Sequence, residues 1–140
     1  MADYDYSVLL TQLGAEHHNR SPKSAAVHEE ACRHLIDGGS HGIRLIEPFP
    51  PRITEATGGW MVDEDGHRIL DLWQGHMANI LGHNPQVVTT ALSRAFAGGF
   101  GTQSGLVDAL QAELAALVCR LTSSERIRFT TSGSLSTMYA

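Results

Sequence analysis

The chain has 140 residues, of which 42% are hydrophobic and 18% are charged, as in an ordinary globular domain. Ten Lys+Arg against fifteen Asp+Glu give a net charge of −5, and without a basic stripe this predicts no nucleic-acid binding. No apolar run approaches the roughly 20 residues that span a bilayer, and the acidic N-terminus has no secretory signal. We therefore expect a cytoplasmic protein without membrane contact, in which Cys32 and Cys119 are reduced.

The first third of the chain predicts one well-formed helix. Residues 1–23 are interpreted as a flexible extension, with a short helix at most over residues 4–13 and a polar linker over residues 14–23. Ser24 is predicted to cap a helix that runs to about Asp37, because apolar residues recur there at helical spacing and Gly38-Gly39 follow. The prolines at positions 48, 50 and 51 predict an extended segment after it.

The middle of the chain predicts a β-hairpin. Residues 53–57 and 60–62 have strand character, the Asp-Glu-Asp-Gly stretch at 63–66 forms a turn, and residues 68–72 form the return strand. The turn resembles part of a calcium loop, but it lacks two of the acidic ligands, so a solvated turn is predicted. The eight histidines have no spacing typical of metal ligands, and we expect no metal site.

The remainder predicts two helices and the start of a larger domain. After a loop over residues 75–83, one helix begins near Pro85, and a second covers residues 106–121 with leucines at spacings of three and four. Residues 126–131 predict a strand that feeds a turn and a new helix. The fold class is therefore α/β, with an α+β N-terminal subdomain over residues 24–104 and a large domain that starts at 105–140. Because a strand, a turn and half a helix are only part of a βαβ unit, we expect the sequence to be truncated.

Two places carry candidate binding chemistry. At Ser132, Gly133 and Ser134, unpaired N–H groups at a helix start and two hydroxyls can donate to an anion such as a phosphate. The alternative, which the spacing alone favours, is an ordinary N-cap without a ligand. Arg44 lies in a loop and can bind a carboxylate through two N–H groups, although a solvated surface arginine is the alternative.

Several stretches, in their order along the chain, resemble the class III aminotransferases, which have the type I pyridoxal-phosphate fold. Within that family, the glutamate-1-semialdehyde 2,1-aminomutases are the most similar. The resemblance covers roughly residues 24–140. The matching stretches are Gly38-Gly39 with Arg44, Pro51-Arg52-Ile53, the hairpin from Gly58 to Asp71, Leu81-Gly82-His83 with Pro85, Phe100-Gly101, and Arg128-Phe129 through Ser134.

The resemblance implies a cofactor, a substrate and a partner. The cofactor is pyridoxal 5'-phosphate, and its phosphate binds at Ser132, Gly133 and Ser134. The substrate is a small amino compound, with Arg44 on its carboxylate and Trp73 or His76 in the loop that faces it. The active site forms in a homodimer, or with a complementing C-terminal part that carries the lysine to which the cofactor is attached.

The sequence also departs from the family. Leu135-Ser136 stand where the family usually has Glu-Ala, and Lys23, the single lysine, lies outside the matched stretches. We therefore predict no catalytic residue in the chain and no activity for the 140 residues alone. The alternative is a non-catalytic short paralogue that serves as a dimerisation or regulatory partner of a full-length aminotransferase.

Overall fold

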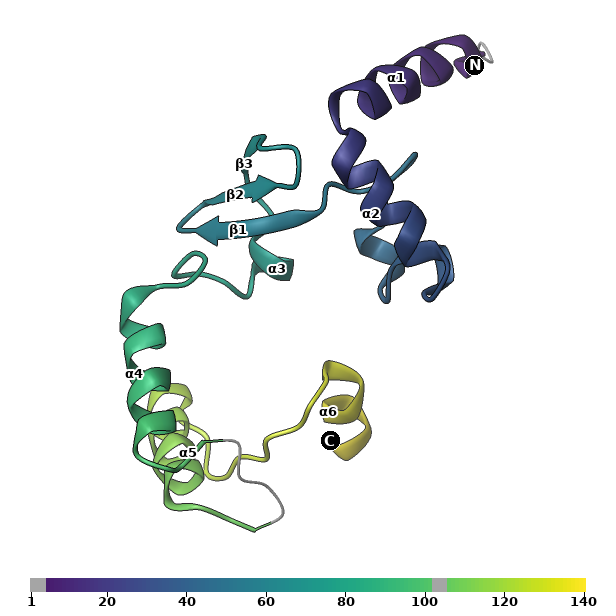
Figure 1. The fold of residues 1–140 in the computed structure, drawn as a ribbon. Coiled ribbons are helices and arrows are strands. Elements are labelled where there is room, and N and C mark those ends of the chain that lie inside the picture. The colour runs from purple at the N-terminus through teal and green to yellow at the C-terminus, as the bar shows by residue number, and fades with distance from the viewer. Residues whose placement is uncertain (1–4, 102–105) are drawn as a thin grey trace. The chain divides into compact units, whose positions relative to one another are not determined.

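The computed structural model describes residues 5–101 and 106–140, and Figure 1 shows its helices and its small sheet. The chain divides into two compact units, residues 1–94 and residues 95–140. Helices combine with one antiparallel sheet, which confirms the predicted N-terminal region of a type I fold. The predicted domain boundary at residues 104 and 105 stays a prediction.

Two helices occupy the region that the sequence predicts to be a linker. Helix α1 (Ser7–Arg20) runs through the predicted linker, and α2 (Pro22–Cys32) begins two residues later. The linker prediction is wrong because Pro22 occupies the first helical position, where its missing N–H costs nothing, and so begins a helix. Gly14 is tolerated inside α1 at a cost of about 1 kcal/mol relative to alanine.

Helix α2 is shorter than predicted, and its cap is different. It ends at Cys32, before the short 3-10 turns η1 (Ile36–Gly38) and η2 (Gly42–Arg44). Ser24 is not the N-cap, because it is the third residue of α2. It is fully buried, and its hydroxyl accepts the main-chain N–H of Arg52 at 3.3 Å. The residue before the helix is Ser21.

The predicted hairpin is confirmed as a three-stranded antiparallel sheet of β1 (Ile53–Thr57), β2 (Trp60–Asp63) and β3 (Arg68–Leu70), in that order. The return strand is two residues shorter than predicted. The turn is also less solvated than predicted. Asp63 is only 4% exposed, because its carboxylate accepts the N–H groups of Asp65 and His67 at 3.0 and 2.7 Å.

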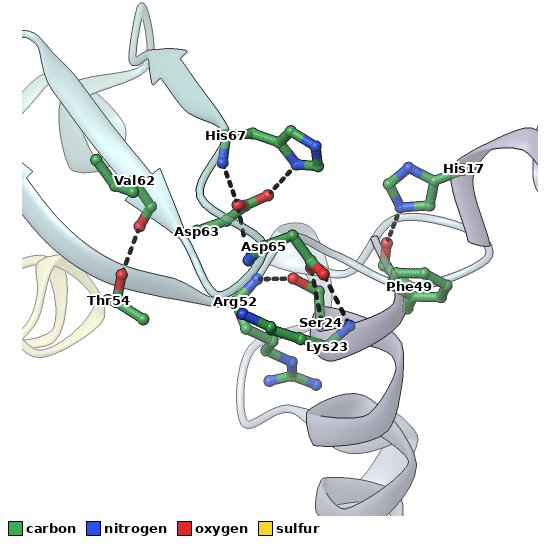
Figure 2. Close-up of polar contacts among 10 residues, drawn as sticks. All are labelled: His17, Lys23, Ser24, Phe49, Arg52, Thr54, Val62, Asp63, Asp65 and His67. Atoms are coloured by element: carbon green, nitrogen blue, oxygen red, sulfur yellow. Dashed lines mark hydrogen bonds and ion pairs between the residues drawn. The ribbon is translucent and has the colours of Figure 1, made fainter. Parts of the chain in front are cut away.

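The hairpin turn is tied to the start of α2, as Figure 2 shows. The two carboxylate oxygens of Asp65 accept the N–H groups of Lys23 and Ser24 at 2.8 and 2.9 Å. Close by, the imidazole of His17 donates to the carbonyl of Phe49 at 3.0 Å. Phe49 is the one buried apolar residue in the described part of the chain. Polar contacts therefore make up much of this junction.

The helices α4 (Gln86–Ala97), α5 (Ala109–Thr122) and α6 (Gly133–Tyr139) agree with three predicted helices. Helix α5 starts three residues after the predicted Leu106, since Asp108 caps it by accepting the N–H of Gln111 at 2.8 Å. The predicted strand over residues 126–131 is wrong. A strand needs a partner for its main-chain groups, and the described residues provide none there. Among the described helices, none has both the length and the apolar character needed to cross a membrane.

Candidate functional site

Trp73 and His76, two of the predicted substrate residues, lie together. Their ring centroids are 4.5 Å apart, and the ring of His41 lies 5.6 Å from that of His76. His41 directly precedes η2, and its carbonyl accepts the N–H of Arg44 at 3.0 Å. We call Trp73, His76 and His41 the ring cluster. The structure thus brings two segments that lie far apart in sequence to one place, and His41 is a member that the sequence analysis missed.

The ring cluster depends on an unusual turn. Helix α3 (Gln74–Met77) is a single turn in which all four residues have positive φ, namely 49°, 60°, 62° and 65°. Only Gly75 adopts this left-handed conformation without cost, so the other three residues are strained. Local strain of this kind is concentrated at functional sites in proteins. The predicted loop over residues 75–83 is therefore an ordered segment with a defined turn.

Asp71 caps this turn. Its Oδ1 accepts the main-chain N–H groups of Trp73 and Gln74 at 2.8 and 3.0 Å, and the amide of Gln74 donates back to the carbonyl of Asp71 at 2.7 Å. The N–H of Gln74, helped by His83 and by the N–H of Trp73, holds the pKa of the Asp71 carboxyl below 3.8, although burial opposes this. The carboxylate is thus the preferred form in the folded chain.

His83 holds the other oxygen of Asp71. Its Nε2 lies 2.7 Å from Oδ2 of Asp71, and the two side chains are 16% and 9% exposed. Because a carboxylate only accepts, Nε2 carries the hydrogen. The amide of Asn79 lies 3.4 Å from Nδ1, the remaining ring nitrogen. Asp71 and His83 are twelve residues apart, and no local pattern in the sequence indicates this pair.

The Ser132–Gly133–Ser134 turn lies in the second unit. Ser132 is the N-cap of α6, and its Oγ accepts the N–H of Leu135 at 3.2 Å. Its carbonyl accepts from the hydroxyls of Thr130 and Ser136 at 3.0 and 3.2 Å. Ser132 is therefore an N-cap, as one of the two interpretations predicts, and Ser136 helps to fix the turn.

The same turn offers groups that fit the oxygens of a phosphate. Among the described residues the hydroxyl of Ser134 has no hydrogen-bond partner, and no heavy atom lies within 4 Å of a Cβ built on Gly133. The N–H groups of Gly133 and Ser134 are in the first turn of α6, where no carbonyl within the helix can accept them. The phosphate itself stays a prediction.

Lys23 and the possible metal ligands do not form a binding site of this kind. Lys23 is exposed in the first turn of α2, and Asp65 accepts its main-chain N–H. Within residues 5–101 and 106–140, no three His, Cys, Asp or Glu side chains are close enough to share a metal ion.

Comparison with known proteins identifies relatives of the chain. The family model for class-III aminotransferases matches residues 45–140. Glutamate-1-semialdehyde 2,1-aminomutase of Deinococcus radiodurans is 39% identical over 105 residues, which are 75% of this chain and 23% of the relative. This chain thus spans about a quarter of the length of that relative.

Solved structures of aminotransferases are also similar to this chain. The β-phenylalanine aminotransferase of Variovorax paradoxus superimposes with a TM-score of 0.85 and 27% identity, over 96% of this chain and 31% of that structure. A transaminase with bound PLP has a TM-score of 0.79 and 27% identity, over 85% of this chain and 28% of that structure.

Proposed function

The chain belongs to the class-III aminotransferase family, and on that premise we propose that it provides a pyridoxal-phosphate-dependent aminotransferase or aminomutase with its phosphate-binding turn. The observation that carries the proposal is the Ser132–Gly133–Ser134 turn at the start of α6, which lies inside the matched residues 45–140. A phosphate requires hydrogen-bond donors, and the hydroxyl of Ser134 and the N–H groups at the start of the helix provide them. The open space beside Gly133 lets the phosphate approach.

In this proposal the turn binds and orients the cofactor. When bound, pyridoxal phosphate supplies an aldehyde and an electron-withdrawing ring for the transfer of an amino group. The hydroxyl of Ser134 and the N–H groups of Gly133 and Ser134 donate to the phosphate, while Ser132 keeps its hydroxyl on Leu135 and holds the turn in shape. Thr130 and Ser136 fix the carbonyl of Ser132 and so keep the donors in place.

The substrate site of the proposal is in the first unit. Arg44 binds the carboxylate of an amino-acid-like or semialdehyde substrate, because a guanidinium matches a carboxylate with two parallel N–H groups. Trp73 and His76 present an aromatic wall and a second polar group to the same substrate. Arg44 follows His41 of the ring cluster by three residues, in the turn closed by the main-chain bond between them. Charge and ring chemistry together favour a small anionic substrate with an apolar portion.

The chain acts with further protein in this proposal, either as a homodimer or with a part that carries the cofactor-holding lysine. Its own single lysine, Lys23, is exposed and outside the matched residues. Large apolar residues are widely exposed, Leu110 at 51% and Leu114 at 49% among them, and such surface is normally covered by another element or chain. We therefore expect no transamination by the 140 residues alone.

A non-catalytic partner of a full-length aminotransferase is the second candidate. The observation that favours it is Leu135-Ser136, where the family usually has Glu-Ala. Ser136 uses its hydroxyl on the Ser132 carbonyl and provides no carboxylate beside the cofactor.

The test uses pyridoxamine 5'-phosphate, which has no aldehyde and cannot react with Lys23. Equilibrium dialysis compares it with pyridoxamine, which lacks the phosphate. We expect the chain to prefer the phosphorylated form. This preference should weaken in Ser134→Ala but not in Ser93→Ala, a serine of α4 whose hydroxyl bonds within its own helix. Equal binding of both compounds would contradict the proposal. Transamination by the chain alone that disappears in Lys23→Ala would contradict the expectation of inactivity.

A further inference from the structure

We propose that Asp71 and His83 are a positioning pair that holds α3 in its left-handed turn and thereby keeps Trp73 and His76 together in the ring cluster. The role of that cluster at a substrate rests on the proposed function. The positioning itself is a property of this chain and is measurable without a ligand.

The two oxygens of Asp71 have separate tasks. Oδ1 accepts both N–H groups that open α3, from Trp73 and Gln74, so it fixes the backbone at the start of the turn. Oδ2 lies 2.7 Å from Nε2 of His83. The position of His83 therefore sets the orientation of the carboxylate plane, and with it the direction in which Oδ1 faces the turn.

His83 is in turn anchored to the sheet. Its main-chain N–H and carbonyl form a pair of hydrogen bonds with Gly58, the residue after β1, at 2.7 and 3.0 Å. Gly82 allows this close approach, because a Cβ there would lie 2.8 Å from the carbonyl oxygen of Gly58. The pair thus connects a rigid hairpin to a strained turn, with Asn79 as a second contact to the His83 ring.

The backbone strain explains why the turn needs the contact between Asp71 and His83. Gln74, His76 and Met77 have φ of 49°, 62° and 65°, which side chains with a Cβ disfavour. Such a conformation persists only when surrounding contacts over-determine it. If the pair is broken, we expect the turn to relax and Trp73 to leave His76.

The experiment measures the exposure of Trp73 in the full 140-residue chain. In a Trp60→Phe background Trp73 is the only tryptophan, and acrylamide quenching reports how accessible it is. Trp73 is 40% exposed, so complete release raises the quenching constant by at most about 2.5-fold. We expect a clear rise toward that limit in His83→Leu.

Two variants separate positioning from a general loss of structure. His83→Gln retains an N–H donor toward Oδ2 of Asp71, so we expect quenching as in the parent chain. His67→Leu is the matched control, because His67 forms a similar pair with Asp63 at 2.9 Å in the hairpin turn, away from α3. In His67→Leu we expect no change in the quenching constant of Trp73.

Some outcomes would overturn the proposal. Unchanged quenching of Trp73 in His83→Leu, or an equal rise in His67→Leu, would do so. A rise of Trp60 quenching in His83→Leu, measured in a Trp73→Phe background, would show that the pair merely maintains the fold. The pyridoxamine phosphate experiment is independent of these readouts, so its failure removes the proposed function and leaves the positioning pair in place.

Discussion

Replacing Gly82 by alanine tests the anchor of the loop, and the structure permits an estimate of the effect. Gly82 has φ of 78°, and a left-handed conformation costs a residue with a Cβ about 1–2 kcal/mol. In addition, the new Cβ would lie 2.8 to 3.0 Å from main-chain atoms of Gly58, which have no flexible end that can move away. Relief of that overlap breaks the two hydrogen bonds between Gly58 and His83, each worth about 0.5–1.5 kcal/mol.

Gly66 provides the matched control for this variant. It has φ of 86°, so alanine there meets the same conformational cost, but nothing lies within 4 Å of its Cβ position. The difference between Gly82→Ala and Gly66→Ala therefore isolates the overlap and the two lost hydrogen bonds, which amount to about 1–3 kcal/mol.

Urea unfolding followed by far-UV circular dichroism measures the difference. With a slope near 1 kcal/mol per molar urea for a small protein, the midpoint of Gly82→Ala should lie about 1–3 M below that of Gly66→Ala. Amide hydrogen exchange should also become faster at Gly58 and His83 in Gly82→Ala only. Equal midpoints for the two variants would refute the reasoning, because they would show that the approach of Gly82 to Gly58 contributes nothing.

Three further predictions concern the caps. The pKa of Asp71 is below 3.8 in the folded chain, so the stability that its carboxylate provides is present above that pH and disappears as the pH falls through the folded value. In Asp71→Asn the urea midpoint should therefore fall less on acidification than in the parent chain. The same fall in both chains would contradict this. Asp65→Ala should accelerate amide exchange at the start of α2, because the Asp65 carboxylate accepts two N–H groups there. Exchange in α5 should stay unchanged. Equal acceleration in both helices would indicate general unfolding instead. Ser132→Ala should destabilise α6 by about 1 kcal/mol, seen as lower helical NMR shifts over residues 133–139, whereas Ser134→Ala should leave the helix intact. Equal effects of the two serines would contradict the division between a capping and a free hydroxyl.

The features that sequence predicted well have local causes. The hairpin follows from alternating residues around an acidic turn that ends in glycine, and β1 and β2 lie where predicted. The start of α6 follows from a serine that caps its own helix. The wrong predictions also have local causes: residues 14–23 were interpreted as a polar linker, whereas Pro22 within them begins α2. A residue type that both ends and starts helices cannot be assigned from its identity alone.

The candidate site needed the structure, because its contacts are not local. Trp73 and His76 were predicted as alternatives for one role, whereas their rings are in contact. His41 joins them from a segment more than thirty residues earlier in the chain. The pairing of Asp71 with His83 depends on a left-handed turn, and nothing in the composition of residues 74–77 except Gly75 favours such a turn. Tertiary contacts decide the backbone there, and a sequence pattern reports only local preference.

The energetic balance of α3 explains why its clamp matters. The three strained residues with a Cβ cost about 3–6 kcal/mol together, at about 1–2 kcal/mol each. Six hydrogen bonds hold the turn, three with Asp71 and three along the backbone from Met77, Ala78 and Asn79. At about 0.5–1.5 kcal/mol each they return about 3–9 kcal/mol. The two ranges overlap, so the strain offsets much of what these bonds contribute. An additional contact, such as the one between His83 and Asp71, then adds to the margin that keeps Trp73 and His76 in contact.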